Sequence, residues 1–168
     1  MQLLKIINPE DVSKAELSSY TVREAGRAVV IDQDRKIALL YVSKENYYKL
    51  PGGGVEAGED KILALSRECI EEIGCNIDIV TEIGSIIEYR KIFELNQTSY
   101  CFLAKVKGLK GIPDFTESEK KRGFEIVWLP YEEAIKALSE NNTTSIEGKL
   151  YITPRDLAFL KEARTLII

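Results

Sequence analysis

The stretch GGVEAGEDKILALSRECIEEIGC, residues 53–75, decides the fold because a glycine-rich turn leads directly into a helical pattern. Apolar side chains recur at helical spacing over residues 60–74, and Gly74 is a natural C-cap. The predicted core-facing stripe of this helix contains Ile62, Leu65, Cys69, Ile70 and Ile73. Three glutamates fall within an arc of roughly 100° on another side: Glu68, Glu71 and Glu72. We therefore predict an amphipathic helix with an acidic patch.

Local helix stability does not explain this acidic patch. Like charges four residues apart destabilise a helix by about 0.2 to 0.5 kcal/mol per pair, and carboxylates near a C-terminus oppose the helix dipole. The upstream segment LPGGG, residues 50–54, lets a ligand approach the backbone closely. A glycine loop facing carboxylates predicts a site for a hard cation such as Mg²⁺, which prefers oxygen ligands and retains waters and substrate phosphates. An ordinary solvated acidic face is the alternative interpretation.

The rest of the chain mixes strand-like and helix-like segments. Apolar, β-branched runs at residues 26–32 and 36–42 are separated by a short polar turn and predict a hairpin. Further strands are predicted at residues 77–89, 98–108 and 124–130, and helices at residues 130–140 and from about Thr153 to Arg164. The sequence contains no internal repeat or convincing linker. We therefore predict one domain, residues 1–168, of the α+β class or an α/β/α sandwich with a mixed sheet.

The composition excludes several classes of function. Lysine and arginine number 23 against 27 acidic residues, a net charge of -4, which argues against binding of duplex nucleic acid. The chain has no histidine, so histidine-dependent catalysis and histidine-ligated metals are excluded. No apolar run is long enough to cross a bilayer, and the N-terminus lacks a secretory signal. We expect a cytoplasmic protein with no membrane partner and with free, buried thiols at Cys69, Cys75 and Cys101.

From Gly53 to Cys75 the residues follow the pattern G-x5-E-x7-R-E-C-x-E-E-x-G-C. This pattern resembles the signature box of the Nudix hydrolases, with the family's charged and glycine positions in register. Two positions that are aliphatic in the family are Cys69 and Cys75 here, and these small apolar residues should still pack. The flanking segments GRAVV, KLPGGG and WLPYEEAI also resemble the family's usual surroundings, from about Gly26 to Leu138. The resemblance implies a Nudix-like α/β/α sandwich.

The resemblance also implies an activity. A Mg²⁺-dependent enzyme, with Mn²⁺ as a substitute, would cleave a pyrophosphate bond in a nucleoside triphosphate or another nucleoside diphosphate derivative. Such hydrolysis needs neutralised phosphate oxygens and an oriented water, which carboxylates with metal ions supply without histidine. Oxidised or unmodified dNTPs are the leading expected substrates, ahead of nucleoside diphosphate sugars and capped RNA ends. The alternative is a non-catalytic nucleotide or sugar-nucleotide sensor, and either protein would be a monomer or a homodimer.

Metal-binding roles follow from the resemblance residue by residue. Glu68 and Glu72 resemble the family's principal metal ligands, and Glu71 is a further ligand or a base. The carbonyl oxygen of Gly52 or Gly53 is expected to complete the coordination sphere.

The general base stays open at this point. Glu68, Glu71 or a carboxylate from a distant loop could serve. In the polar stretch DFTESEKKRGFE, residues 114–125, Glu119 is the first choice and Glu117 the second, with a solvated loop charge as the alternative for each.

Neighbouring residues are expected to support catalysis or to contact the substrate. Arg67 should orient a carboxylate, and Glu59 at the first turn of the helix should brace the loop. Aromatic faces stack on nucleobases for about 1 to 3 kcal/mol per base, although packing on a half-buried strand is the alternative for each tyrosine. Candidate substrate contacts are Tyr47, Tyr48, Lys49, Gly53, Gly54, Tyr89 and Arg90.

Overall fold

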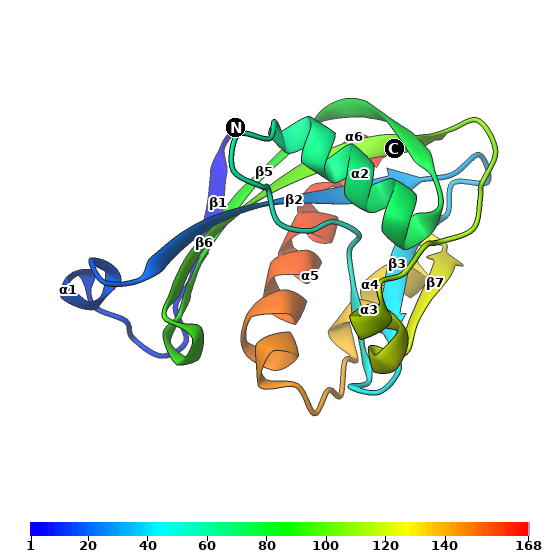
Figure 1. Ribbon diagram of the computed structural model, residues 1–168. Helices are drawn as coiled ribbons and strands as arrows, with labels where there is room; N and C mark the ends of the chain where they lie inside the picture. The colour runs from blue at the N-terminus through cyan, green and yellow to red at the C-terminus, as the bar shows by residue number, and fades with distance from the viewer. Residues whose placement is uncertain (168) are drawn as a thin grey trace.

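The computed structural model describes residues 1–167 and shows a mixed β-sheet with helices on both faces (Figure 1). This arrangement confirms the predicted α+β class with a mixed-sheet sandwich. Six strands lie in the order β1 (Leu3–Ile7), β5 (Asn76–Arg90), β6 (Leu95–Lys107), β2 (Thr21–Ile31), β3 (Ile37–Val42) and β4 (Tyr47–Lys49). A further strand, β7 (Phe124–Leu129), pairs with β3 in antiparallel fashion.

The predicted strands are present but are longer than their apolar runs. β2 begins at Thr21 because it pairs in parallel with β6 over its whole length, from Thr21 opposite Leu95 to Ile31 opposite Lys105. β5 and β6 form a long antiparallel pair that extends beyond the helical layers, close to α1 (Lys14–Leu17) and a 3-10 turn at Lys91–Phe93 (Figure 1). Pairing with neighbours therefore continues past the point where apolar patterning ends.

The sheet separates two hydrophobic cores, because successive side chains of a strand point to opposite faces. Val29 of β2 and Leu39 of β3 belong to the core under α4 (Tyr131–Ser139) and α5 (Thr153–Glu162). The adjacent residues Val30 and Leu40 belong to the core under α2 (Lys61–Ile73). The central strands are therefore buried on both faces.

Helix α2 occupies the position predicted from the sequence, but its buried stripe is narrower than expected. Leu65, Cys69 and Ile73 are buried. The prediction was wrong for Ile62 and Ile70, which are 42% and 48% exposed because the sheet contacts only one side of the helix. The thiols of all three cysteines are free and buried, as predicted.

The C-terminal part contains the two predicted helices and a π-helical turn that was not predicted. Helix α4 follows Pro130, and α5 carries Pro154 in its first turn, where a missing N–H costs no hydrogen bond. The π-helical turn, Gly148–Ile152, leads directly into α5. Helix α6 (Arg164–Ile167) follows α5. None of the helices in residues 1–167 is both long and apolar enough to cross a membrane.

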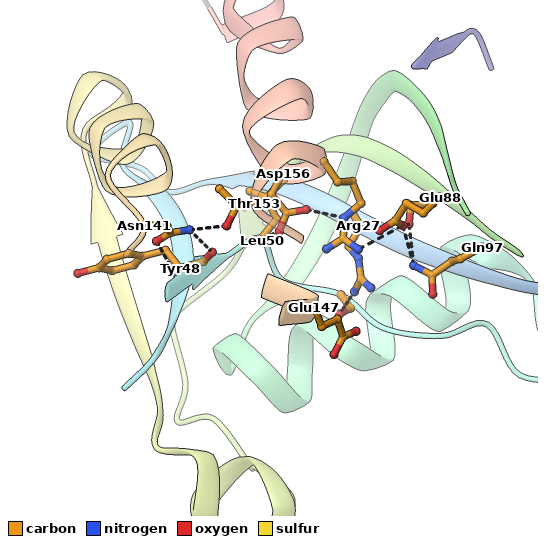
Figure 2. A network of polar contacts seen from close by, with 12 residues as sticks. Arg27, Tyr48, Leu50, Glu88, Gln97, Asn141, Glu147, Thr153 and Asp156 are labelled. Carbon is orange, nitrogen blue, oxygen red and sulfur yellow. Dashed lines mark hydrogen bonds and ion pairs between the residues drawn. The ribbon is translucent and has the colours of Figure 1, made fainter. Parts of the chain in front are cut away.

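Two short elements near the cavity described below were also missed, β4 and α3 (Glu117–Arg122). The outer side of β4 pairs with the side chain of Asn141 (Figure 2). Its Oδ1 accepts from the Tyr48 N–H at 2.9 Å, while its Nδ2 donates to the Tyr48 carbonyl at 3.3 Å and to Thr153 Oγ1 at 2.9 Å. One amide side chain thus binds β4 as a neighbouring strand would.

Candidate active site

The glycine loop after β4 runs beside β2. The Gly26 N–H donates to the Gly53 carbonyl at 2.9 Å, and the Ala28 N–H donates to the Pro51 carbonyl at 3.1 Å. Gly52 has a φ of +129°, and a Cβ at this position would collide with the Gly26 carbonyl oxygen. Glycine is therefore required at residue 52 by both conformation and space.

Helix α2 begins and ends where the sequence predicts. The side chain of Asp60 caps its first turn by accepting from the Ile62 N–H at 2.9 Å, and Gly74 ends it in the left-handed conformation. The three glutamates of the helix differ strongly in exposure, because they occupy different positions around the helix axis. The side chain of Glu68 is 15% exposed, that of Glu71 is 40% exposed, and that of Glu72 is only 2% exposed.

Glu72 is the buried member of this group. Its carboxylate accepts from Lys49 Nζ and from the Gly52 N–H, each at 2.7 Å. Burial raises the pKa of Glu72, whereas the Lys49 ammonium and these hydrogen bonds oppose the shift. In this conformation the predicted metal ligand Glu72 holds the glycine loop against the helix.

Glu68 faces the same loop from the next turn of the helix. A Cβ on Gly53 would collide with the Glu68 carboxylate, so the glycine provides the space that this carboxylate occupies. Arg67 Nη1 donates to Glu68 Oε1 at 2.8 Å, and Arg67 Nε donates to Glu59 at 3.1 Å. The Arg67 guanidinium thus connects Glu68 with the end of the loop, just before the helix begins. The hydrogen bond to Arg67 lowers the pKa of Glu59.

Glu71 lies at the open side of the helix. Burial and the neighbouring Glu68 carboxylate raise the pKa of Glu71, and the charge of Glu119 adds to the effect. Glu119 comes from α3, where its side chain accepts from the Thr116 N–H at 2.8 Å. Two helices far apart in the sequence thus bring carboxylates to one place. Glu117, the second choice, is 82% exposed and pairs with Lys120.

Glu68, Glu72 and Glu119 border a cavity of about 340 Å³ between α2, α3, the sheet and the π-helical turn, whereas Glu71 and Glu117 are not part of its lining. Its lining contains six cationic and four acidic side chains: Arg23, Arg27, Lys49, Arg90, Arg122 and Arg155, with Glu68, Glu72, Glu119 and Glu147. A cavity with this excess of positive charge favours an anionic ligand. We call Glu68, Glu72 and Glu119 of this lining, together with Glu71 on the same helix, the acidic end.

Residues 22–148 match the family model described as the NUDIX domain. The chain belongs to the Nudix family. The Nudix loop and helix, residues 53–75, lie inside the matched region, and so does most of the cavity lining.

Two curated relatives match parts of the Nudix chain. It is 26% identical over 134 residues to the CMP-5'-(N-acetyl-N-hydroxy-3-aminopropyl)phosphonate hydrolase of Streptomyces rubellomurinus, covering 75% of this chain and 61% of that protein. It is 34% identical over 64 residues to the RNA pyrophosphohydrolase of Pelagibacter ubique, covering 36% of this chain and 40% of the relative. The matches thus span less than two thirds of either relative's length.

Solved structures support the Nudix fold. A NUDIX hydrolase from Nitrosomonas europaea matches with a TM-score of 0.65 at 18% identity, over 86% of this chain and 90% of that one. The Ap4A hydrolase of C. elegans matches with a TM-score of 0.60 at 18% identity, over 88% of this chain and 100% of that one. At this level of identity, the likeness concerns the fold alone.

The donor set at the acidic end of the Nudix cavity fits a hard divalent cation, because it consists of carboxylates and backbone carbonyl oxygens beside a side-chain-free glycine. The Gly52 carbonyl oxygen already accepts a hydrogen bond from the Arg27 guanidinium, and the Gly53 carbonyl oxygen accepts one from the Gly26 N–H. Each oxygen would therefore bind a metal ion through its second lone pair. Within residues 1–167, no three Asp, Glu, Cys or His side chains converge as a preformed metal cage.

The predicted substrate contacts separate into two groups. Lys49 and Arg90 line the cavity together with Gly53 and Gly54. Tyr48 instead stacks on Tyr41 at 4.7 Å between ring centroids and borders a different cavity.

Strand alternation explains why Tyr47 lines the cavity whereas the predicted contacts Tyr48 and Tyr89 do not. Tyr47 and Lys49 share the cavity-facing side of β4, so the intervening Tyr48 points away. Tyr89 likewise lies between two residues of β5, Glu88 and Arg90, that point together into a buried polar cluster.

Several polar residues of the cavity were missed from the sequence: Arg23, Arg27, Gln97, Arg122, Glu147 and Arg155. A signal existed for Arg27, since a charged residue inside the apolar run GRAVV must have a partner once it is buried. Arg155 gave no comparable signal, because an Arg next to an Asp in a helix is usually exposed and the second partner of Arg155, Glu88, lies 67 residues away along the chain.

Proposed function

We propose that this chain hydrolyses a pyrophosphate bond in a nucleoside triphosphate or another nucleoside diphosphate derivative with the help of Mg²⁺, for which Mn²⁺ can substitute. The observation that carries the proposal is the Glu68 carboxylate facing the Gly53 backbone beside a cavity rich in arginine. The cationic lining suits a polyphosphate, and the acidic end suits the cation that its hydrolysis requires. The names of both curated relatives concern nucleotide-type substrates, which supports a nucleotide ligand here.

The metal would be held by Glu68 and Glu71, with the Gly53 carbonyl as an additional oxygen donor. A bound Mg²⁺ would supply neutralisation of the negative charge on the phosphate oxygens. Glu72 is proposed as a further ligand, but its carboxylate must first release Lys49, to which it is paired at 2.7 Å. The released Lys49 ammonium could then pair with a phosphate oxygen.

Proton transfer is assigned to the acidic end. A carboxylate with a raised pKa is a stronger base, and burial together with Glu68 raises the pKa of Glu71. Glu71 is therefore one candidate to accept a proton from the attacking water, and Glu119, which lines the cavity from α3, is the other. Arg67 acts as a positioning residue because its guanidinium fixes the Glu68 carboxylate.

The nucleoside itself would lie against the remaining walls of the cavity. Tyr47 and Phe124 supply apolar surface there, although both are largely buried. We propose oxidised or unmodified dNTPs first, followed by nucleoside diphosphate sugars and capped RNA ends. The polarity of the cavity favours a ligand whose charge, not its base, provides most of the contacts.

The test is a panel of nucleotides incubated with the protein while Mg²⁺ is titrated. We expect Mg²⁺-dependent release of a phosphate-containing product, and we expect Glu68→Gln to lower kcat by about 10²- to 10³-fold, as for the loss of one strong electrostatic contact to a transition state. Glu117→Gln is a matched control because Glu117 is 82% exposed and lies outside the cavity lining. Full activity of the Glu68→Gln variant would contradict the proposal.

A nucleotide sensor of the same fold is the second candidate. The observation in its favour is the Lys49–Glu72 pair, which engages one proposed metal ligand. Tight binding of a nucleotide in Mg²⁺, with no member of the panel ever cleaved, would identify a sensor.

A further inference from the structure

Three arginines that are almost fully buried meet at the end of the cavity away from α3. We call Arg27, Arg90 and Arg155 the arginine cluster; they are 7%, 3% and 1% exposed. They come from β2, β5 and α5, respectively. Because burying a guanidinium costs several kcal/mol unless its charge is matched, the partners of this cluster determine what the cavity can bind.

Two buried carboxylates balance part of this charge. Arg90 Nη2 donates to Glu88 Oε1 at 2.8 Å, and Arg155 Nε donates to Asp156 Oδ1 at 2.7 Å. Glu88 and Asp156 are both fully buried. Three cations and two fixed carboxylates leave one positive charge at this end of the cavity. Desolvation and the neighbouring Arg155 lower the pKa of Arg27 to about 10, which is the expected response to that excess.

Glu147 supplies the remaining negative charge, and its setting differs from that of the other two carboxylates. Arg90 Nη1 donates to Glu147 Oε1 at 2.5 Å, yet the Glu147 side chain is 37% exposed. Glu147 has helical backbone angles and directly precedes the π-helical turn, and such turns are often found at functional sites. Figure 2 shows Glu147 approaching the cluster from one side, while Glu88 and Gln97 approach from the other. Because the Glu147 carboxylate is partly in contact with solvent, it can be exchanged for another anion at lower cost than the fully buried Glu88 or Asp156.

Unpaired polar atoms in the same place also indicate a ligand. Gln97 is fully buried, and its Nε2 donates to Glu88 Oε2 at 2.9 Å and to Ser99 Oγ at 3.1 Å. This fixes the amide orientation and leaves Gln97 Oε1 without a partner among the described residues. The Nε atoms of Arg27 and Arg90 are likewise buried and unpaired within residues 1–167. These two unused donors and one unused acceptor are enclosed atoms of residues that line the cavity, and a ligand with an oxyanion next to a hydroxyl would match them once it takes the place of Glu147.

We propose that Glu147 occupies an anion-binding position from which a second oxyanion of the substrate displaces it. This group, a phosphate or a carboxylate apart from the scissile pyrophosphate, binds Arg90, and a neighbouring hydroxyl donates to Gln97 Oε1. The inference rests on the proposed function, since it places the substrate in the same cavity. It limits the substrate to nucleotides that carry an additional anionic group beyond the bond that is cleaved.

The first test measures anion binding without turnover. Inorganic phosphate and, separately, acetate are titrated into the full chain in EDTA by isothermal titration calorimetry. We expect Glu147→Gln to bind one of them about 3- to 10-fold more tightly than the wild type, because the competing carboxylate is gone. The anion whose affinity rises identifies the group as phosphate-like or carboxylate-like. Unchanged or weaker binding of both anions overturns the proposal.

Matched variants show whether the effect belongs to this position. Glu140→Gln removes the same charge from an exposed residue outside the cavity lining and should leave both affinities unchanged. Adding Arg90→Lys to Glu147→Gln should abolish the gain, since an ammonium lacks the planar fork that binds an oxyanion. If Arg90→Lys does not fold, NMR of the arginine Nε–H groups in Glu147→Gln gives the same information: a buried resonance must shift with the anion. A gain that persists with Arg90→Lys, or a spectrum that does not change, contradicts the proposal.

The two proposals can fail separately. If the nucleotide panel is cleaved but Glu147→Gln does not tighten anion binding, only the anion-binding position is disproved. If anion binding tightens and nothing is cleaved, the position stands and the hydrolase assignment fails.

Discussion

The two ends of the cavity treat charge in opposite ways. At the acidic end, Glu68 and Glu71 share the single cation Arg67, and their mutual repulsion contributes to a raised pKa of Glu71. In the arginine cluster, buried guanidiniums are paired with carboxylates of the same element, as in Arg90–Glu88, and of another element, as in Arg155–Glu88. Carboxylates that repel one another in the folded protein are expected where a ligand binds. Buried arginines that are paired with carboxylates instead hold elements of the fold together. Substitutions at the acidic end should therefore reduce activity, and substitutions in the cluster should reduce stability.

The largest loss of stability should follow Asp156→Ala. The variant leaves the buried Arg155 guanidinium without its partner and removes the acceptor of the Leu50 N–H, which donates to Asp156 Oδ2 at 2.8 Å. Breaking one partner of a buried pair costs about 3 to 5 kcal/mol of unfolding free energy. Urea unfolding would measure it, with Asp78→Ala as the surface control, since the exposed pair of Asp78 and Lys107 should contribute about 0 to 1 kcal/mol. Equal losses of unfolding free energy in Asp156→Ala and Asp78→Ala would contradict the prediction that the buried pair contributes more than the exposed one.

Gly52→Ala tests the residue that joins the two ends, because its N–H binds Glu72 and its carbonyl binds Arg27. A Cβ there meets the Gly26 carbonyl at a φ of +129°. Strain of this kind costs about 1 to 3 kcal/mol, and both stability and kcat should fall.

The matched control is Gly58→Ala, which has a φ of +78° and open space around its Cβ. The loss of stability in Gly58→Ala measures the cost of the backbone conformation alone, and the additional loss in Gly52→Ala measures the cost of the collision. Thermal melting of both variants gives the comparison, and a Gly52→Ala protein as stable as Gly58→Ala would show that the loop moves freely.

The smallest effect, a pH dependence, should come from Glu88→Gln. Burial raises the pKa of Glu88, but Arg155 and Arg90 outweigh it, so the folded-state pKa lies below the ordinary value of 4.5. The ionised carboxylate therefore stabilises the fold above about pH 4.5, and this stabilisation is lost as the pH falls through the lowered pKa. The difference in unfolding free energy between wild type and Glu88→Gln should be larger at about pH 7 than at about pH 3.5. A constant difference would show that Glu88 is not ionised in the folded protein.

The acidic end was largely predictable from the sequence, because its main residues lie on one helix and one loop. Spacing places Glu68 and Glu72 on neighbouring turns, and the glycines indicate close backbone approach. Spacing could not show that Glu72 would be buried against Lys49, since that pair depends on β4, a strand too short to be recognised.

The arginine cluster could not be predicted in the same way. Its contacts join residues that are distant in the sequence, such as Arg90 and Glu147, which are 57 positions apart. Periodicity reports which face of an element is buried, but it does not report which charge on another element meets it. Arg90 was expected to contact substrate because of its position after the signature box. Strand alternation places it on the face of Glu88, but the sequence does not show that this face meets Arg155 and Glu147.

The amide of Asn141 has a consequence for how these molecules behave at high concentration. An edge strand with unsatisfied backbone groups is a template on which a second chain can pair and begin to aggregate. At β4 both the N–H and the carbonyl of Tyr48 are already bound by Asn141, which is in turn fixed by Thr153. A single side chain thus occupies the backbone groups with which a strand of another copy could pair at this border of the sheet.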